Sequence, residues 1–258
     1  MKIVFVGAGN LATQLGKAFK RTTHEVVQVY SRTQHSAAEL ASLLKCTYTT
    51  SLQEVTTEAD LYVIAVKDAV MCEVIRQVCP HRSDKVFLHT AGSMPLSVFN
   101  TYAKHYGVFY PLQTFSKQKD LDFKQIPCFI EANDAIAKEV ICNVANILSN
   151  TVYELSSAQR KYLHLAAVYA CNFTNHLYDL SSEILSRNHI PFNVMLPLID
   201  ETTKKVHFCS PHDAQTGPAI RFDQNVIDAQ LALLSEEPAL QNIYRVLSDS
   251  IHEHFNVK

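Results

Sequence analysis

A glycine-rich turn near the start of the sequence constrains the fold of this chain more than any other feature. The apolar run 2–6 leads directly into Gly-Ala-Gly-Asn-Leu-Ala at 7–12, and a helical pattern covers 10–20. In such a strand–turn–helix unit the glycines make a tight turn and let a diphosphate approach the backbone, and the small residue at 12 lets helix and strand pack closely. Free N–H groups at the helix start attract phosphate. We predict a dinucleotide-binding Rossmann domain whose diphosphate contacts are Gly7, Gly9, Asn10 and Leu11.

The first 155 residues alternate between strand-like and helix-like patterns. Apolar runs typical of strands lie at 2–6, 25–30, 61–66, 85–89, 107–110, 128–131 and 151–155, and helical patterns lie at 10–20, 37–44, 69–78, 95–103 and 135–148. Short runs without polar alternation, each followed by a helix, are typical of parallel strands that are buried on both faces. We therefore expect a doubly wound, mostly parallel α/β sheet over residues 1–155.

The sequence changes to an all-helical pattern over residues 156–258. Ser156 with Gln159 three residues later is a capping-box signature, and it opens a long Ala- and Leu-rich helix that runs to about 186. Further helices are expected after Pro191, over 218–234 and from 238 onward. The long helix is apolar on more than one face, so we expect it to be buried in a core or against a second copy of the chain, which predicts a homodimer.

The end of the second strand indicates which nicotinamide cofactor the turn prefers. NAD enzymes carry Asp or Glu there, about 20 residues after the glycine turn, to bind the ribose 2′-hydroxyl. This chain has Ser31-Arg32-Thr33 and no acid. Two hydroxyls and a guanidinium can donate to a 2′-phosphate, and Arg32 can do so as a charge-assisted fork. We predict NADP(H) bound by Ser31, Arg32 and Thr33; the alternative is that Arg32 is an ordinary surface cation.

Two further turns follow strand ends. They are Val66-Lys67-Asp68 and His89-Thr90-Ala91-Gly92-Ser93. Ligands of open α/β sheets bind outside the carboxyl ends of the strands. We therefore expect Val66, Lys67 and Thr90 to border the nicotinamide half of the cofactor. As an alternative, Thr90 and Ser93 only cap the helix expected at 95–103.

The motifs taken together resemble a known group of proteins. They are the glycine turn at 7–12, Ala65-Val66-Lys67-Asp68, His89-Thr90-Ala91-Gly92-Ser93, Tyr110-Pro111-Leu112-Gln113-Thr114-Phe115, and Thr216-Gly217-Pro218 followed by Arg221 and Asp223. The chain resembles, over nearly its whole length, Rossmann-like proteins with a helical C-terminal domain of unknown function. These are commonly labelled NADP oxidoreductases of the deazaflavin-coenzyme-dependent type or relatives of pyrroline-5-carboxylate reductase. The resemblance implies the fold and the cofactor class, and it leaves the substrate open.

The chain departs from the pattern of its relatives at two positions. The family often has His before Pro-Leu-Gln, where this chain has Tyr110. Related β-hydroxyacid dehydrogenases carry a catalytic Lys four residues before an Asn on the long helix; if that Asn is Asn172, the Lys position is Val168. The alcohol-oxidising mechanism that depends on this Lys is therefore not expected here.

Polar residues on the long helix are the first candidates for catalysis. His164, Val168, Asn172 and either Asn175 or His176 lie three or four residues apart, so they share one face of a regular helix. His164 would supply an acid or base, and Asn172 an amide that holds a carbonyl or imine. The alternative is a core histidine and an Asn bonded between helices.

The remaining candidates are expected to bind substrate. Gly217 would begin a helix that binds an anion, and Arg221 would clamp a carboxylate. Arg221 with Asp223 can equally form a structural ion pair. Tyr110 and Gln113 would line the cleft.

Composition excludes several classes of partner. A net charge of −2 gives no basic surface for nucleic acid, and no apolar run approaches the length of a membrane span. We expect a cytoplasmic protein without a signal peptide, whose seven dispersed cysteines are reduced. The cluster of His207, Cys209, His212 and Asp213 matches no standard zinc spacing, so no metal is expected.

The sequence as a whole predicts an NADP(H)-binding oxidoreductase that reduces a small carbonyl or imine substrate by hydride transfer. The alternative is a protein that binds NADP or another nucleotide, or senses its level, without turnover. A third option is a reductase that uses a deazaflavin partner.

Overall fold

The computed structural model describes residues 1–82 and 84–256, which form two compact units, Met1–Asn172 and Phe173–Lys258. The first unit holds the sheet, and it extends past residue 155 because the first turns of the long helix are held to the sheet. The second unit is helical. Each unit is described by itself.

The first unit is built on one eight-stranded sheet in the order β3-β2-β1-β4-β5-β6-β7-β8. Neighbouring strands pair in parallel except β6 with β7, which are antiparallel. This confirms the predicted doubly wound, mostly parallel sheet. The strands are β1 (Lys2–Val6), β2 (Glu25–Tyr30), β3 (Thr47–Thr49), β4 (Leu61–Ile64), β5 (Val86–His89), β6 (His105–Pro111), β7 (Cys128–Ala132) and β8 (Val152–Glu154). The polar edge strand β3 was not predicted, because three residues carry too little pattern.

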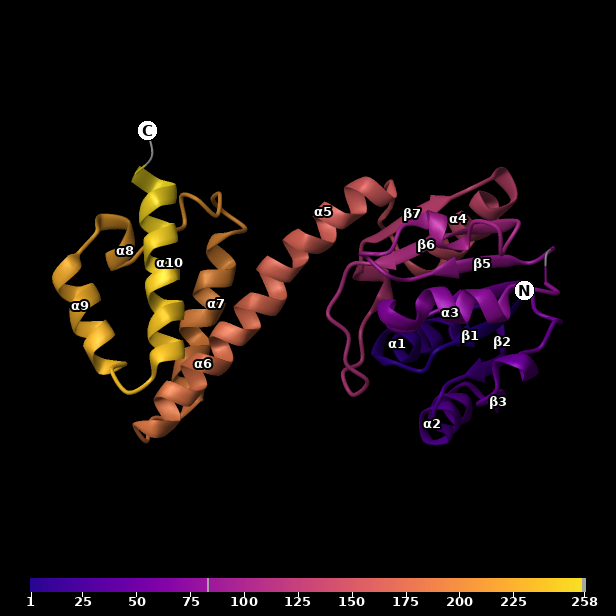
Figure 1. Cartoon of the computed structure of the whole chain (residues 1–258), viewed down its shortest axis with the longest axis horizontal. Helices are drawn as coiled ribbons and strands as arrows, with labels where there is room; N and C mark the ends of the chain where they lie inside the picture. The colour runs from indigo at the N-terminus through magenta and orange to yellow at the C-terminus, as the bar shows by residue number, and fades with distance from the viewer. Residues whose placement is uncertain (83, 257–258) are drawn as a thin grey trace. The chain divides into compact units, whose positions relative to one another are not determined.

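Helices cover both faces of this sheet (Figure 1). Helices α1 (Asn10–Phe19), α2 (Gln34–Leu44) and α4 (Ala135–Leu148) pack in one apolar cluster with Ile3 and Phe5, while α3 (Asp68–Val78) packs in the other with Val4 and Val6. Alternate β1 side chains thus enter opposite cores, which is why that run has no polar alternation. Short 3-10 turns η1 (Leu52–Glu54), η2 (Leu96–Phe99) and η3 (Phe123–Gln125) complete the connections.

The helix expected at 95–103 was wrong. Only the single turn η2 forms there, and Thr101 adopts a left-handed backbone conformation with φ 72°. A non-glycine residue in that conformation cannot continue a helix. Pro95 precedes the turn without a side-chain cap, so Ser93 is not its cap.

The long helix begins as predicted but is not regular throughout. Ser156 and Gln159 form the expected capping box at the start of α5 (Ser157–Ala167). A π-helical segment, η4 (Val168–Phe173), then separates α5 from α6 (Thr174–Arg187). The predicted three- and four-residue spacing therefore fails beyond Ala167, because a π-helix advances through more residues per turn.

The helical unit has a thin core. After α6 it contains η5 (Phe192–Met195), α7 (Leu196–Lys205), α8 (Pro218–Arg221), α9 (Gln224–Leu233) and α10 (Pro238–Asn256). The helix expected over 218–234 is broken at Phe222, whose φ is 50°. Among the residues of this unit that the structure describes, only Ala219, Ile227 and Ser248 are buried.

Three chemical expectations can be compared with the structure. None of the seven cysteines, all of which lie among the described residues, forms a disulfide in the structure. Across residues 1–82 and 84–256, no group of three potential ligands gathers as a metal site. No helix in the same described ranges combines the length and hydropathy that crossing a bilayer requires.

Candidate active site at the carboxyl edge of the sheet

Five strand ends place the predicted cofactor residues along one edge of the sheet. The strand register puts Val6 beside both Tyr30 and Ile64, Ile64 beside His89, and His89 beside Val108. The turns that follow these strands therefore lie in the order of β2, β1, β4, β5 and β6. Four strand spacings separate β2 from β6, which is about 19 Å. An extended dinucleotide is of comparable length.

The glycine turn has the geometry that a diphosphate requires. Gly7 has φ 124°, and a Cβ there would lie 2.2 Å from the Ala65 carbonyl oxygen, so only glycine fits. A Cβ on Gly9 would meet nothing within 4 Å, and Gly9 is exposed at the start of α1. The first turn of α1 has neither a side-chain cap nor an acidic residue. Its free N–H groups can therefore receive an anion.

Asn10 has a structural contact that the sequence did not indicate. Its side-chain Nδ2 donates to the Phe115 carbonyl oxygen at 2.9 Å. This bond ties the glycine turn to the segment after β6. Leu11 is only partly buried and packs against the apolar cluster under α1.

The turn after β2 presents cationic and hydroxyl groups. Arg32 is exposed, and no ion pair of the described residues involves it. Helix α2 begins two residues later and has no acid in its first turn. Thr33 Oγ1 donates to Ser36 Oγ at 3.0 Å, and the Ser31 N–H donates to the Thr49 carbonyl oxygen at 3.2 Å. A phosphate here would meet no competing carboxylate on these residues.

The turns after β4 and β5 are joined to each other. Ser93 Oγ donates to Asp68 Oδ2, and the Thr90 N–H donates to the Ile64 carbonyl oxygen at 3.3 Å. Thr90 is buried, whereas Lys67 is exposed at the start of α3. Asp68 is thus already engaged by a neighbouring hydroxyl, and Lys67 is the cation of this turn that faces solvent.

A tyrosine–histidine pair lies beyond these turns, at the end of β6. Tyr110 Oη and His164 Nδ1 are 3.0 Å apart, with the two rings nearly perpendicular at 77°. A Cβ on Gly92 would lie 2.6 Å from His164 Nδ1 and 2.9 Å from Tyr110 Cζ. The absence of a side chain at position 92 therefore allows the pair to approach the turn after β5. The imidazole of His164 thus reaches the Tyr110 hydroxyl from α5.

A buried ion pair fixes the helix that carries His164. Arg160, only 1% exposed, donates from Nη1 to Glu131 Oε2 on β7 and from Nη2 to the Met94 carbonyl oxygen, both at 2.6 Å. The Ser157 hydroxyl also donates to Glu131, at 2.6 Å, and accepts from the Leu96 N–H at 2.8 Å. These bonds pin the first turn of α5 to the sheet and to the segment after β5. His164 follows one turn later.

Burial and hydrogen bonds shift the pKa values of Tyr110 and of two groups near the pair. It raises the pKa of Tyr110, an effect that the nearby Arg160 only reduces, so the phenol stays protonated at neutral pH. Burial also acts to raise the pKa of Glu131, but hydrogen bonds from Ser157 and Arg160 outweigh it and hold that pKa below its usual range. Burial, followed by the charge of Arg160, lowers the pKa of His89 to about 3. His89 is therefore neutral under physiological conditions.

The pair borders a pocket of about 440 Å³ within the sheet unit. Tyr110, Gln113, His164 and Asn172 line it, together with Leu and Ala side chains. Two predicted catalytic residues and two predicted substrate residues are thus brought to one pocket. Val168, which the regular-helix spacing placed on the same face, does not line it. The volume lies within the usual range for small-molecule sites.

The structure leaves the roles of two predicted site residues open, and it adds site residues that the sequence did not indicate. Gly217 and Arg221 lie in the helical unit, so their roles stay predictions; α8 has only four residues, which weakens the case for an anion site at its start. Arg160 and Glu131 were not singled out, because only the folded chain brings them together. Gly92 belongs to the motif at 89–93, but nothing in the sequence indicated that Tyr110 and His164 would lie beside it.

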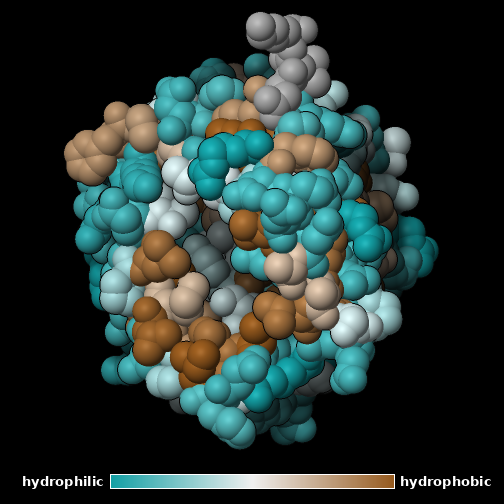
Figure 2. All heavy atoms as spheres, turned by 90° about the vertical axis from the view of Figure 1, so that its left-hand side faces the viewer, coloured by the Kyte–Doolittle hydropathy of each residue, from teal (hydrophilic) through white to brown (hydrophobic). Residues whose placement is uncertain are grey.

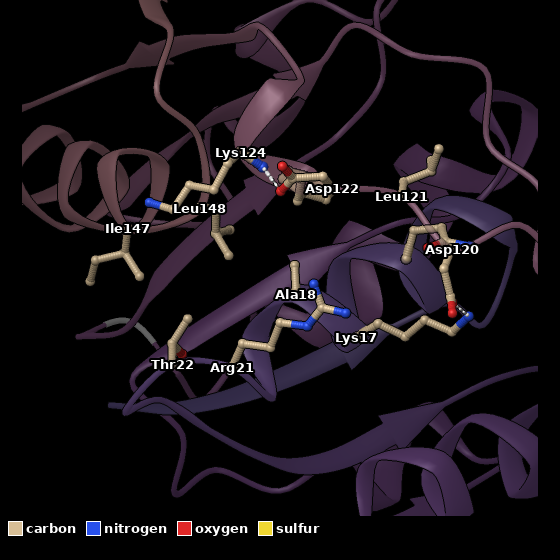
Figure 3. A pocket seen from close by; sticks show the side chains of 12 residues that line it. Lys17, Ala18, Arg21, Thr22, Asp120, Leu121, Asp122, Lys124, Ile147 and Leu148 are labelled. Atoms are coloured by element: carbon tan, nitrogen blue, oxygen red, sulfur yellow. Dashed lines mark hydrogen bonds and ion pairs between the residues drawn. The ribbon is translucent and has the colours of Figure 1, made fainter.

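A second, smaller pocket of about 90 Å³ lies between α1, the segment 120–124 and α4 (Figure 3). Lys17 and Asp120 on its rim form an ion pair at 2.7 Å. Gln14 donates to the carbonyl oxygens of Ser116 at 2.6 Å and Lys119 at 2.7 Å. The polar side chains of this pocket therefore hold α1 to the segment after β6, and we assign the pocket no ligand.

Comparison with known proteins agrees with this architecture. A Rossmann-like domain matches residues 1–112, and a domain of unknown function (DUF2520) matches residues 126–251. A crystal structure of a "putative NADP oxidoreductase" from Bacteroides fragilis is 52% identical, with 98% of each chain covered and a TM-score of 0.95. None of the curated proteins compared with the chain matches it.

More distant structures share the fold alone. A 1-pyrroline-5-carboxylate reductase from Streptococcus pyogenes is 16% identical over 98% of both chains, with a TM-score of 0.64. An imine reductase from Myxococcus stipitatus, solved with NADP+, is 17% identical over 99% of this chain and 93% of the other, with a TM-score of 0.66. The chain therefore belongs to the family of the Bacteroides fragilis protein, in which a Rossmann-like domain is followed by a DUF2520 domain.

Proposed function

We propose that this protein is an NADP(H)-dependent reductase of a small carbonyl or imine compound. The observation that carries the proposal is the order of groups along one sheet edge: Arg32 after β2, the glycine turn after β1, and the Tyr110–His164 pair at the end of β6. A dinucleotide bound along this edge would have its 2′-phosphate at one end and its nicotinamide at the other end, near the Tyr110–His164 pair. We call these two residues the acid pair. The name of the 52% identical relative supports the same cofactor class.

The residues present fit the cofactor. The open surface at Gly9 and the uncapped start of α1 would hold the diphosphate, and Arg32 with Ser31 and Thr33 would hold the 2′-phosphate. Val66, Lys67 and Thr90 would border the nicotinamide. When bound, NADPH supplies a hydride to the substrate carbon.

The acid pair would supply the proton that reduction of a carbonyl or imine requires. Tyr110 Oη donates its proton to the substrate oxygen or nitrogen as negative charge develops there. The phenol oxygen then recovers a proton from His164 Nδ1, which is 3.0 Å away, and the imidazole takes one from solvent at its other ring nitrogen, so the protons balance.

The amides in the pocket would orient the substrate. Asn172 and Gln113 line the same space as the acid pair, and each carries both a donor and an acceptor. A protein that only senses a nucleotide has no need of such an acid pair beside a pocket, so the pair favours turnover over sensing.

Titration of purified protein with NADPH and NADH, followed by nicotinamide fluorescence, tests the cofactor assignment. We expect NADPH to bind more tightly, and Arg32→Ala to weaken NADPH binding about 10- to 100-fold while leaving NADH binding nearly unchanged. Arg76→Ala is the matched control, because Arg76 is an exposed Arg in the last turn of α3, paired with Glu73. Equal loss in both variants, or tighter binding of NADH, would refute the assignment.

Turnover of NADPH against a panel of ketones, aldehydes and cyclic imines tests the reaction. We expect Tyr110→Phe to lower kcat about 100-fold or more while the Kd for NADPH stays within about twofold. Tight NADPH binding with no turnover of any panel member would favour the sensing alternative.

We also propose that the protein forms a homodimer through its helical unit. Brown, apolar side chains gather on the face of this unit that Figure 2 presents. The exposed large apolar residues of the unit include Leu177, Val194, Leu196, Leu198, Phe208, Phe222, Leu233, Val246 and Leu247. A monomeric protein rarely exposes so many large apolar side chains in a unit that buries so few residues.

Light scattering tests the dimer, since a monomer has a mass of 29.0 kDa. We expect about twice this mass at micromolar concentration, and a shift toward the monomer mass for Leu198→Glu. Ile136→Glu is the matched control, because Ile136 is similarly exposed in the sheet unit. A monomeric mass for the unmodified chain would refute the proposal.

A further inference from the structure

The pocket beside Tyr110 and His164 is mainly apolar, and its described lining holds no side chain of fixed charge. Among the described residues that line it there is no Lys, Arg, Asp or Glu. Its walls are Leu112, Leu163 and the alanines at 166, 167 and 170, and its polar groups are neutral amides and hydroxyls. Such a lining favours uncharged ligands, because a charge taken out of water needs a partner.

Neither cation that precedes His164 on α5 lines the pocket: Lys161 is exposed to solvent, and Arg160 is held within the fold. Arg160 lies one turn before His164, but its side chain is 1% exposed and its two Nη atoms are bonded to Glu131, Met94 and Ser157. The guanidinium is thus neutralised within the fold. A substrate carboxylate would find neutral hydrogen-bond donors on the walls of this pocket but no side chain of fixed positive charge.

A substrate cation is equally disfavoured. No carboxylate lines the pocket, and Glu131, the acid of this region, is held by Ser157 and Arg160. An imine that is already protonated in solution would therefore lose its hydration without gaining a counter-ion. A neutral carbonyl needs only the hydroxyl of Tyr110 at its oxygen, and its substituents can lie against the small and branched side chains of α5.

We propose that this pocket takes an uncharged ketone or aldehyde with an apolar substituent, and rejects substrates that carry a carboxylate or a fixed positive charge. This inference rests on the proposed reductase function and names its substrate class. It makes Arg221 unnecessary as a carboxylate clamp. The pocket volume of about 440 Å³ leaves room for a six-membered ring.

The test uses three ring ketones of related size: cyclohexanone, 4-oxocyclohexanecarboxamide and 4-oxocyclohexanecarboxylate. Cys171 lines the pocket and its thiol is exposed, so a bound ring should protect it from iodoacetamide. Mass spectrometry of the Cys171 peptide then gives an apparent Kd without turnover, in the whole protein with NADP+. Cys72 and Cys209, both exposed and neither among the residues that line this pocket, are internal controls.

We expect the ketone and its carboxamide to protect Cys171 at concentrations at least tenfold below the carboxylate, and the rates at Cys72 and Cys209 to stay unchanged. Protection by the carboxylate equal to that by the carboxamide would overturn the inference. Absence of protection by all three rings would also overturn it, because the pocket would then not admit the class.

A charge placed in the pocket should reverse the preference. Ala170→Lys adds an ammonium to the wall, and Ala170→Met adds similar length without charge. We expect the carboxylate-to-carboxamide affinity ratio to rise at least tenfold in the Lys variant and to stay unchanged in the Met variant. An unchanged ratio in both variants would contradict a pocket that selects by charge.

The outcome separates this inference from the proposed function. If neutral rings protect Cys171 selectively but NADPH is never oxidised in their presence, the ligand class stands and the reductase assignment fails. If NADPH is oxidised with the carboxylate at least as fast as with the carboxamide, the reductase assignment stands and the substrate class fails.

Discussion

Replacing Gly92 by alanine tests the acid pair without touching either member of it. The added Cβ would lie 2.6 Å from His164 Nδ1, whereas ordinary contacts of a Cβ begin near 3.4 Å. The imidazole must therefore retreat by about 0.8 Å. Since Tyr110 Cζ would also lie only 2.9 Å away, the two rings cannot both keep their places. A retreat of this size takes the 3.0 Å bond between Oη and Nδ1 beyond hydrogen-bonding range.

The Gly92→Ala substitution should lower the reaction rate rather than weaken cofactor binding. Misplacement of a catalytic group by about 1 Å lowers rates up to about 100-fold. We predict that Gly92→Ala lowers kcat about 10- to 100-fold, leaves the Kd for NADPH within about threefold, and destabilises the fold by about 1–2 kcal/mol.

A double-mutant cycle gives the sharpest assay. If alanine at 92 acts only by separating the pair, it should cost little further in a Tyr110→Phe background, since that variant has already lost the bond. Single-turnover kinetics of the four proteins would measure the coupling. Fully additive losses, or an unchanged kcat for Gly92→Ala, would refute the assignment of the pair as the acid.

Three further predictions concern the groups around the pair. Replacing Arg160 by Met should lower the free energy of unfolding by about 3 kcal/mol, because it leaves Glu131 without its ionic partner, and it should lower kcat as well. Arg160→Lys should recover part of that kcat. Urea titration measures the stability, and steady-state kinetics measure the rate. The pKa of His89 is lowered to about 3 in the folded chain against about 6.5 unfolded, so its contribution to stability is present above pH 6.5 and is lost as the pH falls, by about 2.5 kcal/mol between pH 7 and 4.5; urea titrations of His89→Phe should show a correspondingly weaker pH dependence. A Ser93→Ala variant should loosen the turn after β5 by removing the bond to Asp68, which hydrogen exchange of the Thr90 amide would detect as faster exchange.

Local chemistry explains which parts of the fold could be predicted from the sequence. The glycine turn, the alternating elements of the sheet and the Ser156–Gln159 capping box each depend on residues close in the chain, and the structure contains all of them. The helix expected at 95–103 failed because Thr101 takes a left-handed conformation, and the one expected over 218–234 failed at Phe222 for the same reason. Neither residue type signals such a conformation.

Long-range contacts explain why the site was only partly predicted. His164 and Tyr110 were named separately, but they lie 54 residues apart and meet only because β6, β7 and α5 are neighbours. The π-helical segment changed which residues share a face, so Asn172 lines the pocket and Val168 does not. A pattern search that assumes 3.6 residues per turn cannot detect this shift.

The proposed proton donor, Tyr110 with His164, and the residues that hold it all lie within the sheet unit. The contacts that position His164 run from Gly92 and Met94 through Glu131 to Arg160, and every one of these residues precedes the helical unit. A substitution in α7 to α10 should therefore change the oligomeric state while leaving the pair intact. Loss of the acid function with retained cofactor binding should come only from the few residues that hold the first turn of α5. In the proposed reductase, the placement of that turn, rather than the glycine loop that identifies the fold, would therefore decide whether the acid pair can act.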